Sequence, residues 1–234
     1  MTPGTKLAGQ AGGAASSAPL TLSLPEQIAA RLSERITAGT YAPGRRVMEQ
    51  EVSVEFGVSR GPVREALRLL EKDGLVTILP RRGAQVTQLS IAEVREIFDI
   101  RAALNGLRDR QIAEGRDRAQ LLPVLEQAVE RLARLARSPS DADEYVETVF
   151  ELNQMLIDSA PSRRLRVILS SLALQTLRYS RLGLSTPERR LQSVRNWQRL
   201  VKAVRGGDGL EAQRAAEQRV LDSRDAAIRE LERA

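Results

Sequence analysis

Four basic side chains recur every four residues between positions 60 and 72, and this spacing places them on one face of a helix. They are Arg60, Arg64, Arg68 and Lys72. Such side chains follow one another along a helix, and at about 1.5 Å per residue the row is roughly 18 Å long. Guanidinium groups on this row can donate hydrogen bonds to phosphates or to the edges of guanine bases. The competing interpretation is an ordinary solvated helix face.

A second basic group follows at a predicted turn. Residues 75–79 and 84–86 have the composition of short strands, and Pro80-Arg81-Arg82-Gly83 lies between them. Proline and glycine at these places favour a tight hairpin turn. Arg81 and Arg82 are therefore expected at the tip of a β-hairpin, a basic wing beside the basic helix.

Two further helices are predicted ahead of the basic helix. Apolar spacing predicts one over residues 24–39 and another over residues 49–56, which ends at Gly57. Ser59 is a good candidate for the N-cap of the third helix, and Pro62 is tolerated in its first turn. Two short helices joined by a tight turn indicate a helix-turn-helix. The order helix, helix, basic helix and basic hairpin makes DNA binding far more probable than a solvated face.

Composition excludes much of the chemistry of enzymes. The 234 residues include no cysteine and no histidine, so a disulfide, a thiolate nucleophile, an imidazole base and a Cys/His metal site are all excluded. No phosphate-binding loop or Gly-x-Ser-x-Gly motif occurs. We expect no enzyme and no cofactor. The net charge of +6 is a weak argument, because residues 24–89 carry ten basic and eight acidic side chains.

The chain also lacks the marks of export or membrane insertion. No apolar run reaches the roughly 20 residues that span a bilayer, and no secretory signal opens the sequence. We expect a cytoplasmic protein with no membrane partner. Residues 1–20 are rich in Gly, Ala, Ser and Thr and are predicted to be a disordered tail.

Helical patterns dominate after Ser90, a candidate N-cap. The predicted fold is mainly α, with an N-terminal winged helix-turn-helix and a C-terminal antiparallel bundle of helices. The predicted domains are residues 21–89 and residues 90–234. The bundle helices are expected over 90–114, 119–136, 142–159, 163–183, 187–205 and 209–232.

Residues 24–89 resemble the DNA-binding domain of the GntR family of bacterial repressors. The matching stretches are Ala42–Val47, Gly57–Leu67, Leu69–Val76 and Arg81–Ala84. The second half is similar to the FCD domain of the FadR subgroup, through Ile97–Leu104 and Val201–Asp208. The resemblance implies that Arg60 and Arg64 contact operator DNA. Supporting contacts are implied for Ser59, Gly61, Arg81, Arg82 and Gly83, and the helical row adds Arg68. Gln50 stands where some relatives have a DNA-contacting arginine and is left out.

Many FCD domains hold a divalent metal with one aspartate and three histidines. The resemblance places these ligand positions on Val149, Asn153, Trp197 and Arg219, none of which keeps the family's residue. A valine, a tryptophan and an arginine cannot coordinate a cation, and one amide oxygen is not enough. We therefore predict that this domain holds no metal.

Four polar side chains fall on predicted apolar faces of the bundle. They are Arg101, Asn153, Trp197 and Arg219, and burying an unpaired charge is costly. One explanation is internal pairing with a carboxylate on a facing helix. Another is a cavity where Arg219, with Arg101, binds an anionic ligand directly. A collapsed domain that senses nothing is the third. Arg178 and Tyr179 are further candidates for the cavity, with an ordinary core role for Tyr179 left open.

These patterns predict a homodimeric repressor that binds a short inverted repeat of double-stranded DNA. Its effector is expected to be a small organic acid, bound at Arg101, Asn153, Trp197 and Arg219. The alternative is a constitutive DNA-binding regulator whose helical domain is purely structural. An enzyme is the third and least favoured class.

Overall fold

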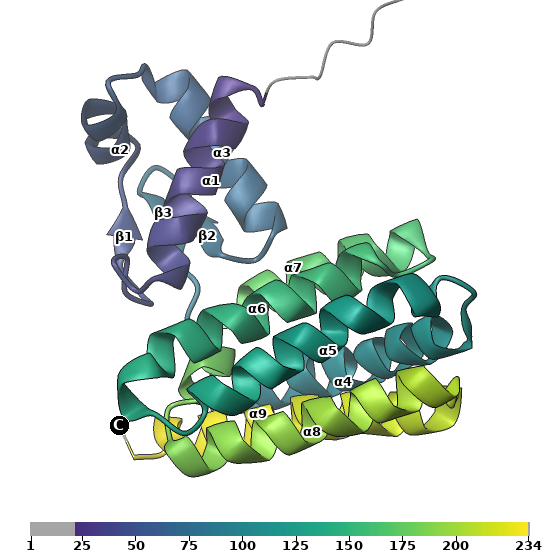
Figure 1. Ribbon diagram of the computed structural model, residues 1–234. Helices are drawn as coiled ribbons and strands as arrows, with labels where there is room; N and C mark the ends of the chain where they lie inside the picture. Colours follow the sequence, from purple (N-terminus) through teal and green to yellow (C-terminus); the bar gives the residue numbers. More distant parts are fainter. Residues whose placement is uncertain (1–21, 234) are drawn as a thin grey trace, which may run out of the picture.

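The computed structural model describes residues 22–233, and their main chain is predominantly helical (Figure 1). An N-terminal unit of three helices and a small sheet lies against a bundle of six longer helices and one short 3-10 turn. The predicted fold class is confirmed. The predicted disordered tail, residues 1–20, lies outside the described residues.

Three helices and three strands form the N-terminal unit. Helix α1 (Leu24–Thr37) packs along α3 (Arg60–Lys72), and α2 (Glu49–Phe56) packs against the same helix. The amphipathic face of α3 buries Val63, Ala66, Leu67 and Leu70 against this core, so its opposite face is left to solvent.

The sheet of this unit consists of short antiparallel strands in the order β1-β3-β2. Strands β2 (Val76–Leu79) and β3 (Gly83–Val86) form the predicted hairpin, with Leu79 paired to Gly83. Strand β1 (Arg46–Val47) adds a third strand, with Arg46 opposite Gln85. The sequence did not predict β1, because two residues are too short to show the alternation of a strand.

The second unit contains α4 (Ile91–Glu114), α5 (Arg118–Leu135), η1 (Pro139–Asp141), α6 (Ala142–Asp158), α7 (Arg163–Leu182), α8 (Pro187–Gly206) and α9 (Gly209–Leu231). The predicted bounds of its α-helices agree within one residue, while the short turn η1 was not predicted. The start of α4 shows why such bounds are predictable. The Ser90 hydroxyl accepts from the Glu93 backbone N–H, and the Glu93 carboxylate accepts from the Ser90 N–H, which is a capping box.

Helix α7 lies on the side of the bundle that faces the N-terminal unit (Figure 1). Leu174 of α7 packs against the N-terminal core. Gln175 lies so close to Gly74 that a Cβ at Gly74 would be 2.6 Å from the Gln175 Cδ. Tyr179 accepts a hydrogen bond from the Leu89 backbone N–H at 3.0 Å, so α7 also holds the segment that joins the two units.

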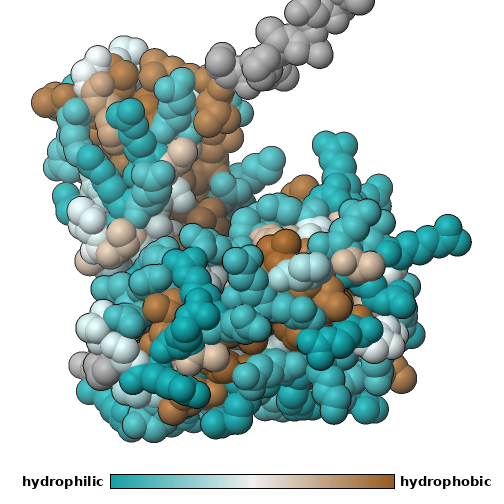
Figure 2. Space-filling view, in the orientation of Figure 1, coloured by the Kyte–Doolittle hydropathy of each residue, from teal (hydrophilic) through white to brown (hydrophobic). Residues whose placement is uncertain are grey.

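Hydrophilic side chains cover most of the visible face of the bundle, with hydrophobic patches between them (Figure 2). Within residues 22–233, no helix combines the length and the apolar character that crossing a bilayer demands.

Candidate functional site

The predicted basic row lies on the solvent face of α3. Arg60, Arg64 and Arg68 are all exposed, and the side chains of Arg64 and Arg68 keep 56% and 61% of their surface accessible. Gly61 is also exposed, with nothing within 4 Å of a Cβ placed on it. The glycine therefore leaves space beside the first turn of α3, where a backbone or a base edge could approach closely.

Helix α2 holds two of these arginines in place. Arg64 donates from Nε and Nη2 to both carboxylate oxygens of Glu49, at 2.9 and 3.0 Å. These bonds lower the pKa of Glu49. Arg60 Nη2 donates to Gln50 Oε1 at 3.1 Å, so Gln50, which the sequence analysis set aside, belongs to the same surface. The start of α2 thus orients the guanidinium groups of α3.

Ser59 occupies the N-cap position of α3 with extended backbone, but its side chain makes no capping hydrogen bond. The expectation of a side-chain cap was wrong in this respect. The exposed hydroxyl is left available beside Arg60, because the first N–H groups of α3 do not engage it.

The hairpin tip carries two exposed arginines in a strained turn. The Arg82 N–H donates to the Leu79 carbonyl at 2.9 Å, which closes a β-turn over Pro80 and Arg81. Arg81 has φ 62°, the only positive φ of a non-glycine residue in the described chain. Gly83 has a structural reason, since a Cβ there would lie 2.5 Å from the Val47 carbonyl oxygen. The turn therefore presents Arg81 and Arg82, while Gly83 lets β3 approach β1.

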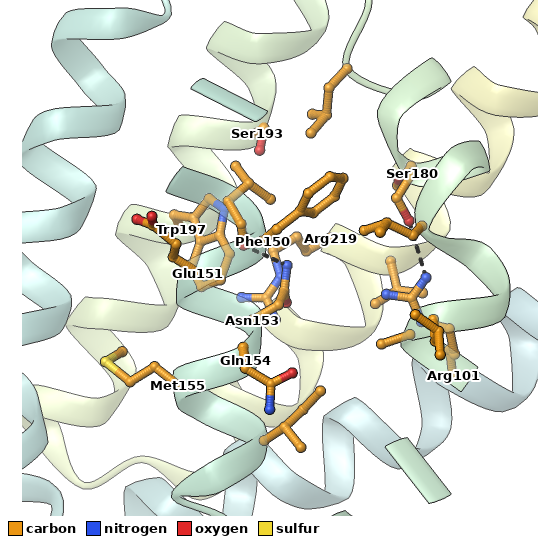
Figure 3. Close-up of a pocket in the computed structure, with 18 of the residues that line it drawn as sticks. Arg101, Phe150, Glu151, Asn153, Gln154, Met155, Ser180, Ser193, Trp197 and Arg219 are labelled. Atoms are coloured by element: carbon orange, nitrogen blue, oxygen red, sulfur yellow. Dashed lines mark hydrogen bonds between the residues drawn. The ribbon is translucent and has the colours of Figure 1, made fainter. Parts of the chain in front are cut away.

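A cavity of about 1130 Å³ lies within the helical bundle, lined by residues of α4, α6, α7, α8 and α9. All four predicted effector residues line it: Arg101, Asn153, Trp197 and Arg219. Figure 3 shows Arg219 beside Trp197 and Asn153, with Arg101 near Ser180. Arg178 and Tyr179 do not line this cavity. Tyr179 packs instead in a core cluster with Val94 and Phe98.

Buried charges in the bundle are strongly unbalanced. The described residues include five buried arginines but a single buried carboxylate, that of Asp109. The arginines are Arg101, Arg108, Arg189, Arg190 and Arg219. An uncompensated buried cation is costly in a low-dielectric interior, so this region favours the approach of an anion.

Arg219 is held mainly by an aromatic ring. Its guanidinium carbon lies 3.7 Å from the centroid of the Trp197 ring, within the range of a cation–π interaction. Its Nη2 reaches Asp109 Oδ2 at 3.4 Å, whereas Arg108 Nε donates to Asp109 Oδ1 at 2.6 Å. The Nη1 of Arg219 is buried without a hydrogen-bond partner among the described residues. Burial lowers the pKa of Arg219 to about 10.

Arg101 has hydroxyl partners and no carboxylate partner within residues 22–233. Its Nη1 donates to Thr176 Oγ1 at 2.5 Å and to Ser180 Oγ at 3.1 Å, both on α7. Burial lowers its pKa to about 9, and the charges of Arg108 and Arg219 lower it further. Internal pairing, one of the explanations left open by the sequence, therefore applies to Arg219 in part and to Arg101 not at all.

The residues at the family's metal positions do not fit a divalent cation. Asn153 donates from its side-chain amide to the Val149 carbonyl at 2.9 Å, which leaves one amide oxygen as a ligand. The indole of Trp197 offers an N–H donor, and Arg219 brings a positive charge that repels a metal. Across the part of the chain that the structure describes, no three Asp or Glu side chains gather as a metal site would require.

The sequence analysis missed Arg108, Asp109 and Arg189. Arg108 and Asp109 continue the inward face of α4 seven and eight residues after Arg101, so a longer extension of that stripe would have found them. Arg189 precedes Trp197 by eight residues on α8 and also lines the cavity. These charges were overlooked because charged residues at helical spacing usually face solvent.

Comparison with protein families agrees with both units. Residues 24–86 match the family described as "Bacterial regulatory proteins, gntR family", and residues 96–221 match the FCD domain. The chain is 34% identical over 139 residues to the uncharacterized HTH-type transcriptional regulator YdhC of Bacillus subtilis (strain 168), covering 59% of this chain and 62% of that protein. It is 36% identical over 135 residues to the HTH-type transcriptional repressor RspR of Escherichia coli (strain K12), covering 58% of each. The chain thus spans about three fifths of the length of these relatives, which are transcriptional regulators and not enzymes.

Solved structures share the fold at low sequence identity. The E. coli McbR/YncC structure has a TM-score of 0.71 at 18% identity, covering 90% of this chain and 100% of that one. A GntR transcriptional regulator from Rhodococcus sp. RHA1 has a TM-score of 0.67 at 20% identity, covering 87% and 96%. Because both family models match in the order in which the two units occur, the chain belongs to the GntR family of DNA-binding transcriptional regulators and carries an FCD domain.

Proposed function

We propose that this regulator is a homodimeric repressor that releases operator DNA when a small organic anion enters the bundle cavity without a metal ion. The observation that carries the proposal is the cavity wall, where buried Arg101 and Arg219 lack a full complement of negative charge. A carboxylate between them would accept hydrogen bonds from guanidinium groups that are already fixed in place. The gain is largest there because the site excludes water.

The DNA contacts are proposed for the exposed face of α3 and the hairpin tip. Arg60, Arg64 and Arg68 are spaced along one helix face, and Arg81 and Arg82 project from the turn. Ser59, Gly61 and Gly83 complete the proposed contact surface. A helix in the major groove and a wing at the neighbouring backbone would use these side chains for base and phosphate contacts.

Helix α7 offers a physical link between the cavity and the DNA-binding unit. Thr176 and Ser180 accept hydrogen bonds from Arg101, while Gln175 and Tyr179 touch the N-terminal unit and its linker. An anion that draws Arg101 toward itself would therefore change the contacts of α7. A ligand shifts the equilibrium only when it binds one arrangement better, and this helix makes such a preference possible.

The remaining parts of the proposal come from the family. Residues 21–89 are proposed as the DNA-binding domain and residues 90–234 as the effector-binding and dimerisation domain. Two copies related by a two-fold axis would read an inverted repeat. RspR is named as a repressor, and we extend the same sign of regulation to this chain. Size-exclusion chromatography with light scattering tests the dimer directly.

The DNA assignment is tested by Arg64→Ala in a binding assay with the chain's own operator, found by selection from a random DNA pool. We expect a loss of about 1–3 kcal/mol in operator binding, because a base or phosphate contact is removed. The matched control is Arg137→Ala, since Arg137 is exposed after α5, far along the chain from the basic face. Unchanged operator affinity in Arg64→Ala would refute the assignment.

The effector assignment is tested by thermal-shift screening of small organic acids against the wild type and Arg219→Ala. We expect acids that stabilise the wild type to lose their effect in the variant. Equal stabilisation of both proteins would overturn the role of Arg219. If no acid stabilises either protein, and operator affinity ignores all of them, the helical domain is structural and the regulator is constitutive.

A further inference from the structure

Arg189 is a buried arginine of the cavity wall that the proposed anion site at Arg101 and Arg219 does not use. It is 7% exposed and lines the same cavity from α8. Its Nε donates to the Asp222 backbone carbonyl at 3.3 Å, and its Nη1 is buried without a partner among residues 22–233. Burial lowers its pKa.

The nearest carboxylate does not neutralise Arg189. Asp222 Oδ2 accepts from Asn196 at 2.6 Å and from Gln192 at 2.8 Å, while Oδ1 accepts from Gln218 at 2.7 Å. Only the Asp222 main chain meets Arg189. In the described part of the chain, Arg189 forms no salt bridge.

Arg189 and Arg219 mark two separate ends of one cavity. Arg189, Ser193 and Trp197 follow one another at four-residue intervals on α8, and all three line the cavity. At about 1.5 Å per residue, the Cα atoms of Arg189 and Trp197 are about 12 Å apart. Arg219 stacks on Trp197, so one positive group lies at each end of this row. Figure 3 shows Ser193 on the side of Trp197 away from Gln154.

The wall between these ends is mostly apolar. Val149, Phe150, Leu177, Leu184 and Val220 contribute to it. The carboxylates of Glu147 and Glu151 also line the cavity, but both are exposed and form ion pairs with Arg181 and Arg131. The volume of about 1130 Å³ exceeds what a short acid would fill.

We infer that the effector is an elongated dianion, with one acid group at Arg219 and Arg101, the other at Arg189, and an apolar spacer between them. This inference rests on the proposed anion site and adds a second subsite to it. The two groups must lie at opposite ends of the molecule, because the arginines lie at opposite ends of a row on α8. Ser193, halfway along the row, is placed to meet a polar group on the spacer.

Calorimetric titration with a chain-length series tests the two-ended site. The probes are succinate, adipate, suberate and sebacate, compared with the monocarboxylates hexanoate and octanoate. We expect suberate to bind about tenfold or more tightly than octanoate, because it adds a charge-assisted pair at Arg189. Succinate is expected to lose this advantage, since it cannot reach both ends.

Arg189→Met isolates the second subsite. We expect it to lower suberate affinity about tenfold and to leave octanoate affinity nearly unchanged, while Arg189→Lys restores part of the difference by returning a positive charge. Arg137→Met is the control for the loss of an arginine, and thermal melting of each variant shows that it is folded.

The outcomes separate this inference from the proposed function. If suberate and octanoate bind equally well and both depend on Arg219, the anion site stands and the second subsite is wrong. The same holds if Arg189→Met weakens both probes equally. If no probe binds in a way that depends on Arg219, the proposed function itself fails.

Discussion

Arg219 lies over the indole of Trp197 at 3.7 Å, although the two residues come from different helices, α9 and α8. The ring covers one face of the guanidinium and leaves its N–H edge free. One part of that edge makes a long contact with Asp109 at 3.4 Å, and Nη1 has no partner among the described residues. Arg219 is therefore positioned by an aromatic ring rather than by a tight ion pair.

This arrangement predicts opposite effects for two substitutions in one cluster. Asp109→Asn removes the single buried carboxylate and leaves Arg108 unpaired, so we expect the free energy of unfolding to fall by about 3–5 kcal/mol. Arg219→Met removes a cation with no tight partner and leaves the Arg108–Asp109 pair intact. Its free energy of unfolding is expected to stay equal or rise by about 1 kcal/mol.

Urea unfolding followed by circular dichroism measures both values. A loss in Arg219→Met as large as that in Asp109→Asn would identify Arg219 as a structural partner of Asp109. In that case the internal-pairing explanation would apply to Arg219 in full.

A lysine in place of Arg219 should make ligand binding depend on pH. Burial lowers the pKa of Arg219 to about 10, so the wild-type cation persists through neutral pH. A lysine begins from about 10.4 and can fall by several units when buried. The variant then carries its charge below this lowered pKa and loses it as pH rises through that value.

We therefore expect octanoate affinity in Arg219→Lys to fall between about pH 6 and about pH 9, whereas wild-type affinity stays nearly constant over the same range. Calorimetric titration at several pH values gives the comparison. Identical pH profiles in the two proteins would show that the charge at this position does not bind the anion.

The helices were predictable because their signals are local. The Ser90–Glu93 capping box lies within four residues, and the apolar spacing of α4 needs no knowledge of its neighbours. Strand β1 was missed because it has two residues and gains its place from pairing with β3. The Ser59 cap was wrong for the opposite reason, since a residue type that favours a cap does not guarantee the hydrogen bond.

The candidate site was predictable only in part. Apolar stripes showed that Arg101 and Arg219 point inward, which each helix decides by itself. The meeting of Arg219 with Asp109, 110 residues apart, depends on the register of α9 against α4. No local pattern fixes that register, and the same holds for the contacts of α7 with the N-terminal unit.

The hairpin tip predicts a separation of stability from DNA affinity. Arg81 has φ 62°, a conformation that costs a non-glycine residue about 1–2 kcal/mol. Arg81→Gly relieves this cost but adds freedom to the unfolded chain, worth about 0.5–1 kcal/mol. We expect the free energy of unfolding to stay equal or rise by up to about 1 kcal/mol, while operator affinity falls.

Operator binding at several salt concentrations tests the role of the Arg81 charge. Loss of one phosphate contact lowers the salt slope by about 1 per site occupied. Arg81→Asn serves as the control, because asparagine tolerates the left-handed conformation and lacks the charge. A wild-type slope and affinity in both variants would exclude Arg81 from the interface.

The last prediction concerns the link between the cavity and the DNA-binding unit. The Tyr179 hydroxyl accepts from the Leu89 N–H at 3.0 Å, and the same helix accepts from Arg101 through Thr176 and Ser180. Tyr179→Phe cuts the contact with the linker and leaves the cavity wall intact. We expect the affinity of the ligand-free protein for its operator, and its affinity for suberate, to change less than about threefold.

The effect of suberate on operator binding should decrease in Tyr179→Phe. Coupling between two sites is commonly worth about 1–3 kcal/mol and is reciprocal, so operator DNA should also change suberate affinity less than in the wild type. Tyr145→Phe is the matched control, since the Tyr145 hydroxyl donates to the Arg190 carbonyl inside the bundle. If both variants keep the full wild-type coupling, the linker contact of α7 does not transmit the signal. If Tyr145→Phe loses it equally, the loss reflects general loosening of the bundle.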